Sequence, residues 1–436
     1  MPRVYAKIQI LIIIFSTFLL SGCGTGFYSP SAPNTGIVTN NPDSIPNIAW
    51  QTPGQRQVLS EQSNAAAPQV PPPEVTLVPP VTKEEVPAPV HQKIIVSLLL
   101  PLSGPKSALG QSMLKAAQMA LFDIGSANFE LVPLDTKRTK QGAVAAAQAA
   151  LDNHSSLILG PVFADDLKAI KPIINPTHTP IIAFTTDWTL AGDNTYIMGF
   201  LPFTQVMRVV KYAQGHGYSK LAIYAPQTEY ADVVVRTLEK SGISVVHVSR
   251  YPATQTDLAA SVESFANSSK SGNAFDFDSL MLPLGSEGLR SLVTTLNTDG
   301  IDQRKVKFIG TGLWDDATLN NNPALFGGWF SAPDPGMRAD FEKRYQGDYG
   351  TAPLRLSSLA YDATALASVL ARSATDPALA YTPEALTNPR GFAGIDGIFR
   401  FRADGLSERG LAVLELRSGG PKVIDPAPTA FISSGT

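Results

Sequence analysis

The sequence predicts an α/β protein of two lobes, each built on a mainly parallel sheet flanked by helices. A disordered tether is expected to precede the two lobes. Apolar runs typical of buried strands alternate with helical spacings from residue 93 onward, and the alternation occurs in two successive series. Strands that alternate with helices favour parallel sheets. The chain of 436 residues, 44% of them apolar, is long enough to bury two cores.

The first series of elements ends near residue 200. Four apolar or alternating runs predict strands, at KIIVSLLLP (93–101), FELVPLD (129–135), SLILG (156–160) and PIIAF (180–184). Helices are expected between them: one with Met113, Ala117, Leu121 and Ile124 on a shared face, one over 142–151, and one that extends through Ile170. The order is strand and helix in strict alternation, as in a doubly wound sheet.

The second series repeats this design after Phe200. Strands are expected at 220–226, 243–251, 279–283 and 306–310, with helices near 203–210, 233–238, 257–266 and 287–298. Two further helices, near 336–346 and 356–372, precede strands at 398–401 and 411–416. We therefore expect a first lobe of 92–202 and 336–401, a second lobe of 203–335 and 402–425, crossovers near 200–204, 331–335 and 402–410, and a tail of 426–436.

The N-terminus is typical of a bacterial lipoprotein precursor. Arg3 and Lys7 precede an apolar stretch from Ile8 to Leu20, which is too short for a membrane span of ~20 residues but suits a signal peptide. Leu-Ser-Gly-Cys at 20–23 matches a lipobox, and Cys23 is the only cysteine, so it cannot form an intrachain disulfide. We predict a signal peptide over 1–22 and acylation of Cys23; the alternative is an uncleaved apolar anchor with a stray cysteine. Glycine rather than aspartate at position 24 favours the outer membrane.

Residues 23–91 indicate a proline-rich linker. The stretch from Gly24 to Val90 holds 13 of the 35 prolines, and Asn, Ser, Gln and Thr fill much of the rest. Proline removes backbone donors and favours extended conformations, so we predict a disordered tether that lets the folded body work away from the membrane.

Composition argues against several function classes. The formal net charge is −3 and no long basic run occurs, so we expect no nucleic-acid partner. The five histidines are scattered without metal-ligand spacing, and we expect neither a metal nor a cofactor. Ser103 and Lys106 match the S-x-x-K pattern of serine penicillin-binding enzymes, but they lie in a loop and no KTG follows. We predict that the protein is not an enzyme.

Several phrases carry a family resemblance. PLSGPKSALGQSMLKAAQMALFDI (101–124), the late-strand Asp135, Gly160-Pro161, PIIAFTTD (180–187) and LAYDATAL (359–366) follow one another as in leucine-binding-protein-like receptors. The sequence from about 93 to 425 thus resembles the type I periplasmic-binding-protein family. Within this family, LGQSMLKAAQMALFD, LGPVF and IIAFTTD are most similar to penicillin-binding protein activators. Full-length enterobacterial activators carry a helical-repeat domain where this chain has its tether.

The resemblance implies a ligand cleft between the lobes, at the ends of the strands. In relatives that bind amino acids, serines and amides after the third and fourth strands hold the ligand carboxylate. Here those turns contain Pro161, Phe163 and the helix-opening pair Asp165-Asp166 in one case, and Thr185 with Thr186 in the other. The two acids either compete with an incoming carboxylate or simply cap the helix. The further cleft candidates are Ser103, Asp135, Tyr230, Leu284, Trp314, Asp315 and Tyr361.

These contacts match only part of the amino-acid-binding set. The position of the acid that receives the ligand ammonium falls near Gly312, with Asp315 close by; Leu284 stands where an aromatic lid is common, and Trp314 is either a substitute wall or ordinary packing. We therefore expect a non-enzymatic periplasmic lipoprotein, anchored by Cys23 to the inner face of the outer membrane, that regulates a peptidoglycan synthase. The alternative is the solute receptor of an ABC permease for branched-chain amino acids.

Overall fold

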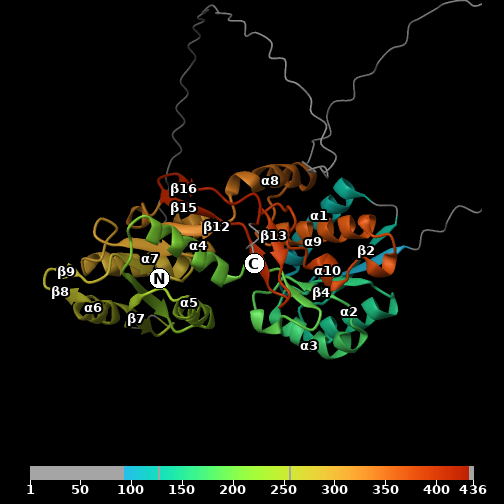
Figure 1. The fold of residues 1–436 in the computed structure, drawn as a ribbon, viewed down its shortest axis with the longest axis horizontal. Helices are drawn as coiled ribbons and strands as arrows, with labels where there is room; N and C mark the ends of the chain where they lie inside the picture. Colours follow the sequence, from blue (N-terminus) through green and yellow to red (C-terminus); the bar gives the residue numbers. More distant parts are fainter. Residues whose placement is uncertain (1–92, 126–127, 255–256, 432–436) are drawn as a thin grey trace, which may run out of the picture. The chain divides into compact units, whose positions relative to one another are not determined.

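The computed structural model describes residues 93–125, 128–254 and 257–431. The predicted signal peptide, Cys23, the tether and the last five residues of the tail lie outside the described residues. The two large sheets in the described part are flanked by helices, which confirms the predicted α/β fold class (Figure 1).

The first sheet is entirely parallel. Its order is β2-β1-β3-β4-β5, made of β1 (Ile94–Leu100), β2 (Phe129–Asp135), β3 (Leu157–Leu159), β4 (Ile181–Ala183) and β5 (Thr195–Ile197). β1 and β2 pair from Ile94 opposite Phe129 to Leu100 opposite Asp135, so both strands end at one edge. The central strands β1 and β3 are apolar on both faces because helices cover both sides.

Two pairs of helices enclose the first sheet. α2 (Lys140–Asp152) and α3 (Ala164–Ile174) share a core with one face, through small residues such as Ala143 and Ala147. α1 (Ser107–Ile124) and α9 (Ser357–Ser373) pack on the other face and against each other. Alanines along α1, α2 and α9 favour helix formation and allow this close packing.

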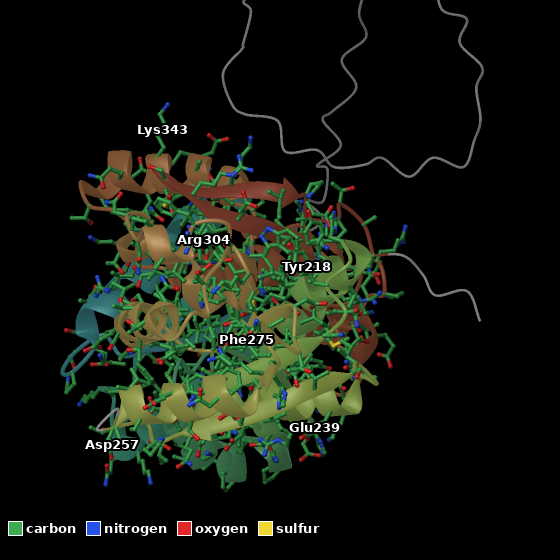
Figure 2. All side chains as sticks on the ribbon, turned by 90° about the vertical axis from the view of Figure 1, so that its left-hand side faces the viewer. Tyr218, Glu239, Asp257, Phe275, Arg304 and Lys343 are labelled. Atoms are coloured by element: carbon green, nitrogen blue, oxygen red, sulfur yellow. The ribbon has the colours of Figure 1, made fainter. Side chains whose placement is uncertain are left out.

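The second sheet repeats the design and then adds antiparallel strands. Its order is β16-β15-β12-β11-β10-β6-β7, made of β6 (Leu221–Pro226), β7 (Val245–Tyr251), β10 (Ser279–Met281), β11 (Lys307–Gly310), β12 (Trp329–Ala332), β15 (Ala412–Arg417) and β16 (Gly420–Asp425). α4 (Pro202–Gly215) and α5 (Glu229–Lys240) cover one face, and α6 (Leu258–Ser268) and α7 (Ser286–Thr298) the other. Charged side chains such as those of Glu239, Arg304 and Lys343 lie on the outside (Figure 2).

The later part of the chain returns to both sheets. α8 (Pro335–Tyr349) packs through Phe341 and Tyr345 against α1 and α9. The expected strand at 398–401 forms as β13 (Phe399–Phe401), but it pairs with β14 (Ser407–Arg409) in a separate two-stranded ribbon. A second small ribbon, β8 (Lys270–Ser271) with β9 (Ala274–Phe275), and the short helix α10 (Pro383–Leu386) complete the named elements.

Candidate functional site

The strand order places a candidate site at the carboxyl ends of the parallel strands in both large sheets. In the first sheet the chain steps outward from β1 to β2 and then returns to β3, so the direction of winding reverses between β1 and β3. The second sheet reverses in the same way between β6 and β10. Ligands of open parallel sheets bind in the crevice at such switch points. The loops after these strands hold most of the residues that the sequence nominated.

Asp135 and Ser103 connect the loops that follow β1 and β2 through hydrogen bonds. Asp135 Oδ1 accepts hydrogen bonds from the amides of Leu102 (2.9 Å), Ser103 (3.2 Å) and Lys137 (2.8 Å), and the Ser103 hydroxyl donates to Oδ2 (2.5 Å). Burial acts to raise the pKa of Asp135, but these hydrogen bonds outweigh it and lower the pKa below its ordinary value. The Asp135 carboxylate therefore holds the two loops in place.

Arg138 covers the turn after β3. Its guanidinium lies 4.0 Å from the ring centroid of Phe163, and Nη1 lies 3.5 Å from Asp166 Oδ1. Asp166 is 1% exposed, and burial, aided by Asp165, raises its pKa even though Arg138 opposes the shift. Of the two acids in the first turn of α3, Asp166 is thus buried beneath an arginine, whereas Asp165 is exposed. Pro161 is buried as well, and its carbonyl accepts from the amide of Phe184 (3.0 Å).

The turn after β4 is partly engaged by its own groups. The amide of Asp187 donates to Thr185 Oγ1 (3.1 Å), and Thr185 is buried, whereas Thr186 is exposed. Asp187 accepts a salt bridge from Lys168 at 3.0 Å. Burial alone would raise the pKa of Asp187, but hydrogen bonds from Thr189 and Lys168 lower it. Thr186 is therefore the more accessible hydroxyl of the two threonines.

Two nominated residues of the second sheet lie in different surroundings: Tyr230 makes an internal hydrogen bond, and Leu284 lines a cavity. The Tyr230 hydroxyl donates to Thr311 Oγ1 at 2.8 Å, and burial raises the pKa of Tyr230 to about 12. Leu284 lines a cavity of about 390 Å³ beside the switch point, together with Pro226, Thr228, Tyr251, Ala253 and residues 285–288. The N-cap residue of α7 is Gly285, which has no side chain that could accept a hydrogen bond from the first amides of the helix. This uncapped first turn of α7 lies beside the cavity.

Trp314 and Tyr361 are buried and make internal hydrogen bonds. Trp314 is fully buried in the core of the second sheet, and its indole N–H donates to the carbonyl of Leu282 (3.2 Å). Trp314 therefore packs among buried apolar side chains of this core. The Tyr361 hydroxyl donates to Asp123 Oδ2 (2.6 Å) near the end of α1, which runs antiparallel to β1 and so ends away from the strand termini.

Asp315 takes part in a network of charges that connects the two sheets. It lies 3.5 Å from Arg338 Nη1 of α8 and 3.6 Å from Arg355 Nε just before α9. Arg355 in turn reaches Asp396 at 3.1 Å. Asp315 follows β11 of the second sheet, whereas α9 packs on the first sheet and α8 packs on α1 and α9. Asp315 therefore acts as a tie between the two sheets rather than as a free acid.

The buried end of this network holds two aspartates and one arginine. Asp362 and Asp396 are fully buried, and Arg409 lies 3.9 Å from Asp362 Oδ2. Asp396 accepts a hydrogen bond from Ser358 (2.5 Å), and Arg355, Arg409 and this bond lower its pKa against the effect of burial. At Asp362 the balance is reversed: burial and the nearby Asp396 raise its pKa to about 7, although Arg409 and the amides of Ile395 and Asp396 act to lower it. The two acids thus differ in charge state near neutral pH.

Asp362 predicts a specific pH dependence of stability. Its pKa lies near 3.8 in the unfolded chain and at about 7 in the folded chain, so the folded state keeps a proton that the unfolded state releases between these values. Its contribution to stability is complete below pH ~4 and is lost as pH rises towards 7. Relative to Asp362→Asn, the wild type should lose up to ~1.4 kcal/mol per pH unit between pH 5 and 7 in urea unfolding. A constant difference across that range would contradict the assignment.

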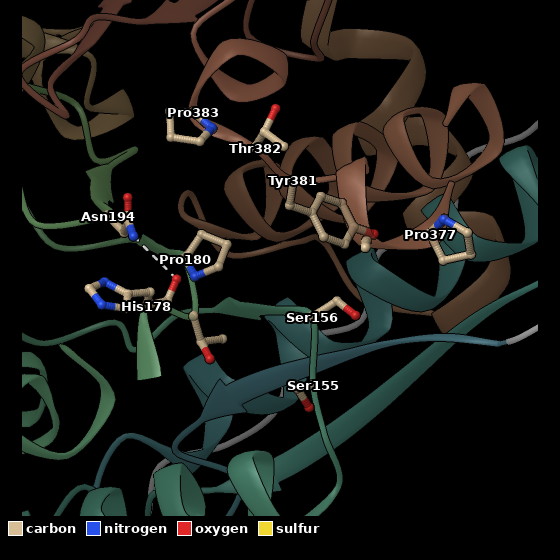
Figure 3. Close-up of a pocket in the computed structure, with 11 residues that line it drawn as sticks. Ser155, Ser156, His178, Pro180, Asn194, Pro377, Tyr381, Thr382 and Pro383 are labelled. Carbon is tan, nitrogen blue, oxygen red and sulfur yellow. Dashed lines mark hydrogen bonds between the residues drawn. The ribbon is translucent and has the colours of Figure 1, made fainter. Parts of the chain in front are cut away.

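Another cavity, of about 340 Å³, lies away from the strand ends that form the candidate site. Ser156, His178, Pro180, Asn194 and Tyr381 are among its lining residues, and they precede or flank the amino ends of β3, β4 and β5 (Figure 3). The Asn194 amide donates to the carbonyl of His178 (3.2 Å). No group of three or more histidine, cysteine or carboxylate side chains suited to a metal occurs among the described residues.

Several residues of the site were not nominated from the sequence. Arg138 contacts Phe163 and Asp166, and Gln205 Oε1 accepts from the amide of Gly312 (2.7 Å). Lys168 pairs with Asp187 in the turn after β4. Arg138 lies in a basic stretch, TKRTK (136–140), that directly follows a predicted strand, and this charge signal could have nominated it. Gln205 gives no such signal, because it is an isolated polar residue on a helix 107 positions from its partner.

Comparison with known proteins assigns the chain to a family. A family profile described as periplasmic binding protein matches residues 93–421. The chain belongs to the periplasmic binding protein family. A leucine-binding protein of Thermotoga maritima is 21% identical over 76% of this chain and 97% of that one, with a TM-score of 0.52. An isoleucine-bound branched-chain amino acid transporter protein of Streptococcus pneumoniae is 19% identical over 77% of this chain and all of that one, with a TM-score of 0.54.

A sequence relative among curated proteins adds little about function. An uncharacterized protein of Rickettsia prowazekii is 22% identical over 186 residues, which span 41% of this periplasmic binding protein and half of that relative's length. Family membership implies a periplasmic location. Among the described residues, no helix has both the length and the apolar character needed to cross a membrane.

Proposed function

We propose that this periplasmic binding protein is a non-enzymatic lipoprotein that regulates a peptidoglycan synthase by direct contact. In this proposal Cys23 carries the lipid, the membrane is the outer one, and residues 23–91 span the distance to the partner. The family resemblance noted from the sequence supplies the class of partner. The two-lobed fold then acts as a protein-contact module rather than as a carrier of solute.

The observation that carries the proposal is the internal use of the groups that would hold a free amino acid. Tyr230 donates to Thr311, Thr185 accepts from Asp187, and the amide of Gly312 donates to Gln205. Phe163 and Asp166 lie beneath Arg138. A ligand carboxylate and ammonium would have to break these bonds, and buried polar groups left unpaired cost ~1–3 kcal/mol each.

A solute receptor is the second candidate, and one cavity favours it. The cavity beside Leu284 has a volume of about 390 Å³, within the ~300–1,000 Å³ range of small-molecule sites. It lies at the switch point of the second sheet, next to the uncapped amino end of α7. A branched-chain amino acid would be the solute, because two proteins of similar fold carry leucine or isoleucine in their names.

A panel of free amino acids separates the two candidates. We expect no rise in the melting temperature of the full-length chain with leucine, isoleucine, valine or other amino acids at millimolar concentration. A receptor with ligand at a hundred times its Kd would gain ~2.7 kcal/mol, a shift that thermal unfolding detects readily. The leucine-binding protein of Thermotoga maritima, assayed with leucine, serves as the positive control. A clear rise for any amino acid would favour the receptor.

Crosslinking in cells tests the partner. The full-length chain, crosslinked in living cells of its own bacterium and purified under denaturing conditions, should carry a bifunctional peptidoglycan synthase. Recovery of permease subunits without a synthase would contradict the proposal. A Cys23→Ala variant, which has no thiol to acylate, should move from the membrane fraction to the soluble fraction and lose the crosslink.

A further inference from the structure

Four cations meet at one edge of the first sheet. Lys106 precedes α1, and Lys137, Arg138 and Lys140 follow β2. β1 and β2 end side by side, with Leu100 opposite Asp135, so the two loops leave the sheet together. A Cβ atom at Gly104 would lie 3.1 Å from the carbonyl oxygen of Lys137, which shows that the loops touch. We call these four residues the basic rim.

The basic rim is held in a fixed conformation. The Asp135 carboxylate bonds the amides of Leu102, Ser103 and Lys137, and so joins both loops. Lys106, Lys137 and Arg138 have φ angles of 70°, 54° and 56°. This left-handed region is unfavourable for a residue other than glycine, and such strain collects at functional sites. The fold therefore maintains an unfavourable backbone where it presents these cations.

The charge of the basic rim is largely uncompensated. Among the described residues, no carboxylate lies within ion-pair distance of the amino groups of Lys106, Lys137 or Lys140, while Arg138 is paired with Asp166. The first turns of α1 and α2 contain no acid. The amino ends of α1 and α2 thus add their positive potential to that of the lysines.

We propose that the basic rim is the docking surface for an acidic segment of the protein partner. This inference rests on the proposed function, because it assigns the contact surface through which the regulator acts. Complementary charge steers such encounters and fixes their register. A membrane surface fits less well: polybasic membrane sites use ~4–8 free cations without defined geometry, whereas the rim offers three unpaired lysines on two stapled loops.

An acidic peptide tests the charge of this surface. The full-length chain, extracted in detergent, is titrated against fluorescein-labelled decaglutamate, with decalysine as the negative peptide. Lys106→Glu/Lys137→Glu/Lys140→Glu should weaken binding about tenfold or more, because it reverses the field that attracts the peptide. The matched control Lys211→Glu/Lys220→Glu/Lys343→Glu changes the net charge equally at exposed positions and should change binding less than about twofold (Lys343 is labelled in Figure 2). Equal weakening by both variants would overturn the inference.

Two competitors separate a protein partner from other anionic surfaces. Phosphatidylglycerol vesicles and isolated peptidoglycan sacculi are added to the wild type and to both variants. We expect that binding to the vesicles and binding to the sacculi do not depend on the rim lysines. Rim-dependent binding to vesicles or sacculi at least as strong as that to decaglutamate would overturn the assignment to an acidic protein segment.

Crosslinking at single positions separates failure of this inference from failure of the proposed function. A photoreactive phenylalanine replaces Gln141, which is exposed beside the rim, or Glu239, exposed on α5 (Figure 2). A synthase captured at Gln141 but not at Glu239, and lost in the rim variant, supports both proposals. A synthase captured by chemical crosslinking yet unaffected by the rim variant overturns the docking surface alone. Absence of any synthase overturns the proposed function, and the peptide titration then decides the docking surface.

Discussion

Replacing Arg409 with methionine is expected to lower the free energy of unfolding by about 3–5 kcal/mol. The Arg409 side chain is 3% exposed and lies near two fully buried carboxylates, those of Asp362 and Asp396. It also donates to the carbonyl of Met198 (3.1 Å) and lies 5.0 Å from the ring centroid of Phe200. Removing one partner of a buried ion network leaves the others without compensation, which costs far more than the network contributes overall.

Urea unfolding of the full-length chain, followed by far-UV circular dichroism, measures this effect. The matched control is Arg402→Met, because Arg402 pairs with Asp404 at the surface, where an ion pair contributes ~0–1 kcal/mol. If Arg409→Met does not fold, Arg409→Lys retains the charge but loses the hydrogen-bond fork, and should show a smaller loss. Similar stabilities for Arg409→Met and Arg402→Met would mean that the two acids are neutral or solvated.

The parts of the fold that could be predicted are those with long apolar or periodic runs. β1, β6 and β11 were found because helices cover both faces of these strands, so the sequence shows an apolar run. β5 and β12 were missed because their short sequences, TYI and WFSA, each contain a polar residue and lack the apolar run that marked the equally short β3 and β4. β16 was missed because it begins with Gly-Pro and alternates weakly at a sheet edge.

The site was less predictable, because its contacts join residues that are distant in the sequence. Local chemistry nominated Ser103 and Asp135, and these two do bond each other. Arg409 and Asp362 lie in different elements and come together only when β14 packs beside α9. Nothing near either residue in the sequence indicates a buried partner, since an isolated charge usually lies at the surface. Long-range pairing of single charges requires the three-dimensional structure.

The burial of Trp314 could likewise not be decided from the sequence, and it leads to the second large prediction. Trp314→Ala is expected to lower the free energy of unfolding by about 3–5 kcal/mol, the usual cost of deleting a buried large aromatic side chain. The indole lies 6.4 Å, centroid to centroid, from the ring of Phe330. It occupies space that Gly310 leaves free, since a Cβ atom there would lie 2.1 Å from the indole ring. Its loss would also remove the hydrogen bond that the indole donates to the carbonyl of Leu282.

The neighbouring residue provides the control for this prediction. Leu313 is 39% exposed, so Leu313→Ala should change stability by less than ~0.5 kcal/mol in the same urea experiment. A wall of the cleft would behave in the opposite way: its truncation would leave stability nearly unchanged and would alter binding to a ligand or partner. A near-wild-type unfolding midpoint for Trp314→Ala would therefore return this residue to the binding surface. A large loss of stability would confirm that the GTGLWDD loop is anchored by its tryptophan in the second core, leaving Asp315 at its end to reach Arg338 and Arg355.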